Sequence, residues 1–98
     1  MYKVRLTPAA KEQLKEIWHY SFDVWGEEKA DAYLMDIKEK LRMLAENPGI
    51  GRNRPDIKPG YHSAPVNKHV IYYMLEEQNI NVIGVLHERM DVRARLLD

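Results

Sequence analysis

Apolar residues alternate with charged ones at the start of the chain and then change to a helical spacing. Residues 2–6 read YKVRL, with every second residue apolar, which is the period of a half-buried strand. Thr7 followed by Pro8 predicts the start of a helix, because a threonine hydroxyl accepts from a free first-turn amide and proline has no amide to leave unsatisfied. Apolar residues then recur every three or four positions up to Trp25, and Gly26 is suited to a left-handed cap.

A second apolar stripe with helical spacing follows Gly26 and stops at residues 47–49, Asn-Pro-Gly, where a helix is costly to continue. The stripe consists of Ala30, Tyr33, Leu34, Ile37, Leu41 and Leu44. Because only one or two residues separate the two helices, we expect them to fold back on each other as a hairpin. We interpret Trp18 and Trp25 on the first helix as core or hairpin-packing residues.

The second half of the chain alternates turn-forming residues with apolar runs. Residues 50–60, IGRNRPDIKPG, are predicted to be a loop by their Gly, Pro and Asp content. YHSAPVN (61–67) indicates a short strand, in which Pro65 requires a sheet edge or a bulge. HVIYYML (69–75) and INVIGVLH (80–87) have apolar residues at both odd and even positions, as strands covered on two faces do. The order β-α-α-β-β-β predicts an α+β fold with the hairpin on one face of an antiparallel sheet.

The composition bounds the size of the protein and its partners. A chain of 98 residues suits a single domain spanning residues 1–98, because so little surface cannot build two cores. Fifteen Lys and Arg balance fifteen Asp and Glu, so the total charge gives no general attraction to nucleic acid or to an anionic membrane. We therefore expect no direct sequence-specific binding of nucleic acid, and recognition of partners by local surfaces.

The residues that usually hold metals or span membranes are missing or wrongly spaced. The chain has no cysteine, which excludes disulfides and thiolate ligands and suits a reducing cytoplasm. Its four histidines match no metal-binding spacing, so we expect neither a metal nor a cofactor. No apolar run approaches the roughly 20 residues of a membrane span, and the N-terminus lacks an apolar signal core. We expect a cytoplasmic protein.

Positive charge is concentrated in the middle of the chain. Residues 8–46 hold six Lys or Arg against nine acids, whereas residues 47–69 hold four against one. Arg52, Arg54 and Lys58 lie in the predicted loop, where a fixed backbone can present them to a partner. The alternative is a solvated loop whose arginines pair with the acidic helices.

The last apolar run leads into VLHERMDV, residues 85–92, with four ionisable side chains within five positions. If the chain stays extended, His87, Arg89 and Asp91 share one face, because side chains two positions apart point the same way. These residues then form a recognition surface. The alternative is an Arg89–Asp91 ion pair that caps the sheet, with His87 half-buried.

Short motifs stand in a fixed order along the whole chain. They are Thr7-Pro8-Ala9-Ala10, Trp25-Gly26, LAENP (44–48), Gly51-Arg52, Gly60, HVIYY (69–73) and VLHERMD (85–91). Together they resemble the ParE family of toxins from type II toxin–antitoxin systems, within the RelE/ParE superfamily, nearly end to end. The resemblance implies a bacterial toxin that acts on DNA gyrase by stabilising cleaved gyrase–DNA complexes. It also implies that the toxin has no catalytic chemistry of its own and is neutralised by a co-expressed ParD-like antitoxin in a hetero-oligomer.

The same superfamily contains ribosome-dependent mRNA endonucleases. Cleavage through a 2′-hydroxyl needs a base, an acid and cations over the phosphate. The resemblance implies that RelE-like enzymes use basic side chains and usually a tyrosine near the C-terminus for this chemistry. The tail MDVRARLLD has no tyrosine, and its Asp91 and Asp98 repel a phosphate, which favours the gyrase branch. The groups left for a weak nuclease are His87, Arg89, Arg93 and Arg95. A degenerate module that only binds an antitoxin is a third alternative.

We expect the antitoxin to bind as an extended chain that supplies both a helix and a strand. A hairpin on a small sheet leaves a groove beside the helices and an unpaired sheet edge, which is a template for strand addition. The antitoxin helix is expected to contact Met35 and Met43, apolar side chains that the core does not use. Its acidic residues are expected to meet Arg52, Arg54 and Lys58.

Overall fold

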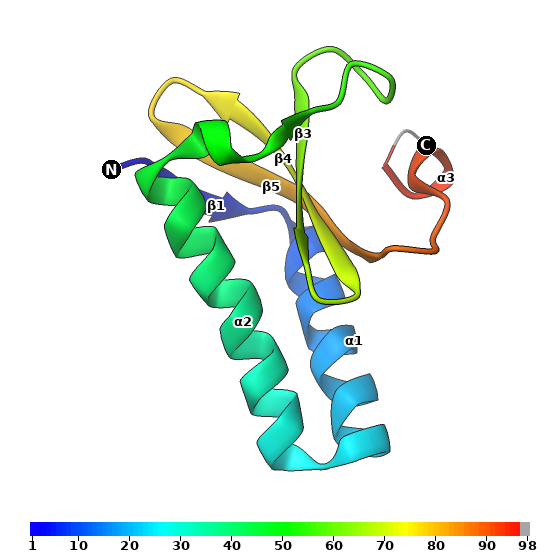
Figure 1. Ribbon diagram of the computed structural model, residues 1–98. Coiled ribbons are helices and arrows are strands. Elements are labelled where there is room, and N and C mark those ends of the chain that lie inside the picture. The colour runs from blue at the N-terminus through cyan, green and yellow to red at the C-terminus, as the bar shows by residue number, and fades with distance from the viewer. Residues whose placement is uncertain (97–98) are drawn as a thin grey trace.

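The computed structural model describes residues 1–96 and has two layers, a helical hairpin and a five-stranded mixed sheet (Figure 1). Its elements in chain order are β1 (Lys3–Leu6), α1 (Pro8–Trp25), α2 (Glu27–Glu46), the 3-10 helix η1 (Pro48–Ile50), β2 (Arg52–Asn53), β3 (Tyr61–Val66), β4 (His69–Glu76), β5 (Asn79–His87) and α3 (Val92–Leu96). The predicted α+β order is confirmed. Three short elements were not predicted from the sequence: the 3-10 helix η1, the strand β2 and the C-terminal helix α3.

The start of α1 and the link to α2 follow the local signals in the sequence. The Thr7 hydroxyl accepts from the Ala10 amide at 3.1 Å, and Pro8 occupies the first helical position. At the other end the Gly26 amide donates to the Phe22 carbonyl at 2.9 Å, and Gly26 alone joins the two helices. Its φ of 93° favours glycine, but its ψ of 172° lies outside the left-handed helical region that was predicted for this cap. The predicted hairpin is confirmed.

The sheet has the strand order β1-β5-β4-β3-β2. β3, β4 and β5 form the predicted antiparallel meander. β1 adds to its far edge in parallel with β5, from Lys3 opposite Asn79 to Leu6 opposite Val82. β2 pairs with β3 only at His62 and Ser63, so Pro65 lies beyond it on the open outer edge of β3, the kind of position predicted for this proline.

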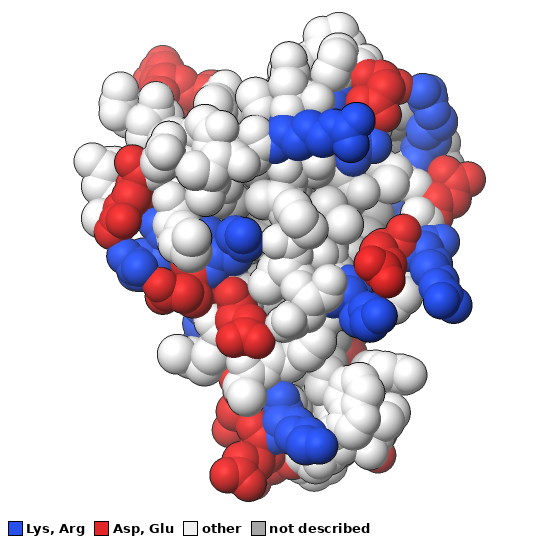
Figure 2. Space-filling model, viewed as in Figure 1, with Lys and Arg blue, Asp and Glu red and all other residues white. Residues whose placement is uncertain are grey.

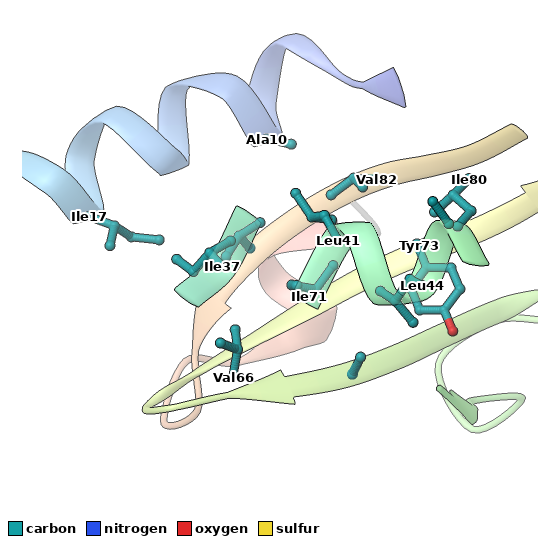
Figure 3. Close-up of a cluster of buried hydrophobic side chains, with 13 residues drawn as sticks. Ala10, Ile17, Ile37, Leu41, Leu44, Val66, Ile71, Tyr73, Ile80 and Val82 are labelled. Carbon is teal, nitrogen blue, oxygen red and sulfur yellow. The ribbon is translucent and has the colours of Figure 1, made fainter. Parts of the chain in front are cut away.

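The main core lies between the hairpin and the sheet (Figure 3). Ile37 and Leu44 of α2 are fully buried against Ile71 and Tyr73 of β4. The Tyr73 hydroxyl donates to the Pro48 carbonyl at 2.9 Å, so this polar group is satisfied inside the core. Each large apolar side chain buried here contributes about 1.5–3 kcal/mol.

A smaller cluster covers the opposite face of the sheet. Ile57, Tyr61, Tyr72 and Leu86 are buried there, and Val92 and Leu96 of α3 pack against them. The central strands are therefore covered on both faces, as their apolar residues at odd and even positions predicted. Strand alternation places Tyr72 in this second cluster and its neighbour Tyr73 in the main core.

The two tryptophans of α1 have different roles. Trp18 is half-buried and its Nε1 donates to Asp31 of α2 at 2.9 Å, which confirms its packing role in the hairpin. Trp25 is 52% exposed, so the core role predicted for it is wrong. The physical reason is geometric, because α1 ends at Trp25 and the tip of the hairpin projects past the end of the sheet (Figure 1).

Candidate partner-binding surfaces

In the basic loop, residues 50–60, one arginine is bonded to an acid of the same loop. Arg54 makes two hydrogen bonds to Asp56, at 3.0 and 3.1 Å, and a third to the Ser63 hydroxyl at 3.3 Å. The hydrogen bonds between them lower the pKa of Asp56 and raise that of Arg54. The alternative in which the loop arginines pair with the acidic helices is wrong for Arg54, because an acid two residues away costs less chain entropy to reach.

Arg52 and Lys58 are exposed, and within residues 1–96 neither side chain forms an ion pair. The backbone under them is well anchored. The Arg54 amide donates to the Tyr61 carbonyl at 2.7 Å, and Ile57 is buried in the second cluster. The loop therefore presents two cationic side chains from a fixed scaffold, which lowers the entropy cost of binding an anionic partner.

The segment 85–92 turns instead of staying extended. β5 ends at His87, and the Asp91 carboxylate caps α3 by accepting from the amides of Arg93 at 3.1 Å and Ala94 at 3.4 Å. The prediction that His87, Arg89 and Asp91 share a strand face is therefore wrong. The alternative Arg89–Asp91 ion pair is also wrong for the described residues, because Asp91 is committed to the helix cap. His87 is half-buried, as the alternative stated, and Arg89 is exposed.

The basic loop and α3 lie side by side on the second face of the sheet. The Arg93 guanidinium donates to the Asp56 carbonyl, and Ile57 belongs to the cluster against which Val92 and Leu96 pack. Two segments that are about 35 residues apart in the sequence thus form one continuous surface. Asp98, which was expected to repel a phosphate, lies outside the described residues.

Met35 and Met43 lie on the outer side of α2, 60% and 41% exposed. The core does not use them, as predicted. Near the same helix, no described strand pairs with the outer edge of β3 from Ala64 to Val66. Exposed apolar side chains on a helix and an open sheet edge are two features that suit a helix-plus-strand partner.

A polar cluster at the end of the sheet was not predicted from the sequence. The Tyr33 hydroxyl of α2 contacts Nδ1 of His69 at 2.6 Å, and the His69 ring packs edge-to-face on His87, its partner across β4 and β5. The signal available was the even spacing of His69, Ile71 and Tyr73, which places His69 on the helix-facing side. Its contact with Tyr33, 36 residues away, carries no local signature.

Burial, and after it the neighbouring His87, lower the pKa of His69 to about 4. The unfolded chain takes up a proton at this residue near pH 6.5 and the folded chain only near 4. The folded state therefore binds fewer protons between these values. The contribution of His69 to the free energy of unfolding is fully present above pH 6.5 and decreases as the pH falls toward 4.

Charge on the visible surface is mixed in sign (Figure 2), with basic and acidic side chains interspersed among neutral ones. This distribution gives local contacts instead of one large field. Across the part of the chain that the structure describes, no three His, Cys, Asp or Glu side chains converge as they would around a metal ion. None of the described helices is both long enough and apolar enough to cross a membrane.

The family model for the ParE toxin of the type II toxin–antitoxin system parDE matches residues 4–92. This chain is a member of the ParE toxin family. Toxin ParE1 of Mycobacterium tuberculosis is 40% identical over 92 residues, covering 93% of this chain and 94% of that protein. Toxin ParE1 of Caulobacter vibrioides is 35% identical over 96 residues, covering 98% and 99% of the two chains.

Solved structures share the ParE fold at lower identity. A chain of the chromosomal ParDE toxin–antitoxin system from P. aeruginosa superposes with a TM-score of 0.78 at 21% identity, covering 89% of this chain and 96% of that one. A chain of the YoeB–YefM complex from Staphylococcus aureus gives a TM-score of 0.60 at 18% identity, covering 89% and 97%. These likenesses establish the RelE/ParE-like fold predicted from the motifs.

Proposed function

We propose that this ParE family member inhibits DNA gyrase by stabilising cleaved gyrase–DNA complexes, and so blocks replication in the cytoplasm without cutting nucleic acid itself. The observation that supports this choice most is that Arg93, one of the three arginines that a nuclease could use, is held away from His87. His87 faces the hairpin beside His69, whereas the Arg93 guanidinium is bonded to Asp56 on the opposite face of the sheet. In this arrangement Arg93 cannot join His87 at one phosphodiester, and of the three arginines only Arg95 lines the same cavity as His87.

The competing function is ribosome-dependent cleavage of mRNA. It requires His87, Arg89, Arg93 and Arg95 to surround one phosphate. Release of α3 from the second face would free Arg93, but it would also expose the apolar side chains of Val92 and Leu96.

An experiment in cells separates these functions. Brief expression of the toxin is followed by pulse labelling of DNA and protein synthesis and by mapping of mRNA ends. Gyrase inhibition predicts that DNA synthesis stops first while mRNA stays intact. Early mRNA cutting with continued DNA synthesis would support the endonuclease, and normal growth would support the degenerate binding module.

We further propose that a cognate ParD-like antitoxin neutralises this protein in a hetero-oligomer. The related P. aeruginosa and S. aureus structures are a toxin–antitoxin system and a YoeB–YefM complex, respectively. On this chain, the features that suit such a partner are the exposed Met35 and Met43, the open edge of β3, and the cationic Arg52 and Lys58. Arg54, bonded within its own loop, offers a partner less of its charge than was expected.

Hydrogen exchange on the free and antitoxin-bound toxin tests this binding mode. A helix on α2 and a strand on β3 predict protection of amides along β3 from Ala64 to Val66, together with stabilisation of α2 near Met35 and Met43. Because the antitoxin binds the folded toxin alone, the melting temperature of the complex should exceed that of the free toxin. Protection confined to isolated loops would contradict this mode.

A further inference from the structure

A cavity of about 400 Å³ lies between the overhanging part of α1 and the ends of β4 and β5. Its walls are mostly apolar, and Ile17, Tyr20 and Trp25 of α1 line one side. Across from them stand His69 and His87 on the strands. This size, and an apolar lining with a few placed polar groups, are typical of sites for small organic molecules.

Hydrogen bonds around His69 determine which nitrogen carries its proton. The Lys68 amide can only donate, so the Tyr33 oxygen accepts from it at 3.1 Å. The Tyr33 proton is then directed to Nδ1 of His69, 2.6 Å away, which leaves the His69 proton on Nε2. Burial raises the pKa of Tyr33 and lowers that of His69, so both groups are neutral near pH 7 and this arrangement persists.

Two more donors of the cavity lining are fixed in the same way. Nδ1 of His87 accepts from the Arg89 amide at 3.1 Å, so its ring proton is carried by Nε2. Oε1 of Gln13 accepts from the Val85 amide at 2.8 Å, so the NH₂ end of this side chain remains a donor. Within residues 1–96 every buried side-chain nitrogen or oxygen has a hydrogen-bond partner. A donor that bonds no protein group is therefore not buried, and solvent or a ligand can reach it.

The charged groups of the lining favour an anion. Lys68 and Arg95 contribute two positive charges against the single carboxylate of Glu16. The aromatic wall adds a preference of its own, because Tyr20 and Trp25 form an edge-to-face pair with ring centroids 6.3 Å apart. Such a wall gains most from a flat ring that stacks on it.

We propose that this cavity binds a small aromatic carboxylate of one or two fused rings. The ring lies between Trp25 and the two imidazoles. The carboxylate accepts hydrogen bonds from the fixed donors and faces Arg95. Because the donors are held in place before binding, little conformational entropy is lost when the ligand enters.

The test uses 2-naphthoate as the probe, with amide and imidazole chemical shifts of the whole chain as the readout. The expected result is saturable shifts at Val85 and His87 and at the ring protons of His69. Two further probes separate the contributions to binding. 2-Naphthalenemethanol keeps the rings without the charge, and cyclohexanecarboxylate keeps the charge without the rings, so each should bind more weakly than 2-naphthoate.

Two variants with a matched control complete the test. Arg95→Gln should weaken binding of 2-naphthoate by about three- to fivefold, the upper part of the range for an exposed ion pair, and leave 2-naphthalenemethanol unchanged. Arg89→Gln removes the same charge from an exposed residue outside the lining, and should have little effect. Trp25→Ala, at an exposed position that the core does not need, should weaken both aromatic probes. Absence of saturable shifts, or equal effects of Arg95→Gln and Arg89→Gln, would overturn the proposal.

Discussion

Replacement of Gly51 by alanine should destabilise the protein although the residue lies in the loop after the 3-10 helix. A Cβ atom at this position would lie 1.8 Å from the Tyr73 hydroxyl oxygen and 2.7 Å from the ring carbon that bears it. The backbone is not the cause, because φ of Gly51 is −78°, which any residue adopts. The clash is with a side chain that is fully buried and whose hydroxyl is bonded to Pro48.

The magnitude follows from two contributions. Forcing an extra methyl group into a packed core costs about 1–3 kcal/mol. If Tyr73 moves away, its hydrogen bond to the Pro48 carbonyl is lost, which costs about 1 kcal/mol more. The sum, about 2–4 kcal/mol, is a large fraction of the roughly 5–15 kcal/mol that stabilises a typical domain.

Urea denaturation followed by circular dichroism measures this difference in the free energy of unfolding. Gly49→Ala is the matched control, because the nearest atom to its new Cβ, Oδ1 of Asn47, is 3.4 Å away, and we expect a loss below about 1 kcal/mol. Tyr73→Phe removes the oxygen at 1.8 Å, so the double variant should lose less than the sum of the single ones. Equal stability of Gly51→Ala and Gly49→Ala would refute the reasoning.

Three further predictions concern the helix cap, the buried histidine and the cationic surface. Thr7→Ala should cost about 1 kcal/mol in urea denaturation because an amide of α1 loses its cap, and Thr7→Ser should restore most of it; an unchanged midpoint would contradict the cap. Between pH 7 and pH 5 the wild type should lose about 1 kcal/mol, less than the roughly 2 kcal/mol ceiling that linkage sets over this window because His69 is only half-buried, and His69→Gln should flatten this slope; the same slope in both proteins would assign it to other groups. Arg89→Glu should abolish toxicity with folding and antitoxin affinity largely retained, whereas Lys11→Glu on α1 should stay toxic; Arg52→Glu should also abolish toxicity but weaken antitoxin binding, because Arg52 belongs to the proposed antitoxin surface. Loss of folding, toxicity and antitoxin binding together in Arg89→Glu would indicate a structural role for this arginine.

The elements that sequence patterns predicted here are those specified by neighbouring residues. The Thr7-Pro8 signal and the single Gly26 place the ends of the helices, because caps are made by residues within one turn. Apolar residues at odd and even positions of β4 and β5 predicted cover on two faces, and a buried cluster lies on each face of the sheet. Exposure of Met35 and Met43 followed from their positions off the apolar stripe of α2.

The features that were missed depend on distant contacts. The parallel pairing of β1 with β5 joins residues about 76 positions apart and has no local signature. The exposure of Trp25 results from the length of the hairpin relative to the sheet, which a periodic pattern does not reveal. The turn after His87 was also missed, although the sequence carries a signal for it. Asp91 stands before an apolar-periodic segment, which is an N-cap signature of the kind that correctly placed α1.

Cleavage of plasmid DNA by purified gyrase tests the central claim most directly. Gyrase, relaxed plasmid and ATP are incubated with increasing toxin, and the products are denatured with detergent and protease before electrophoresis. Poisoning of gyrase predicts that linear DNA accumulates with toxin and returns to the background level once the antitoxin is equimolar. Unchanged levels of linear DNA at every toxin concentration, together with cutting of mRNA on translating ribosomes by the same preparation, would contradict the account.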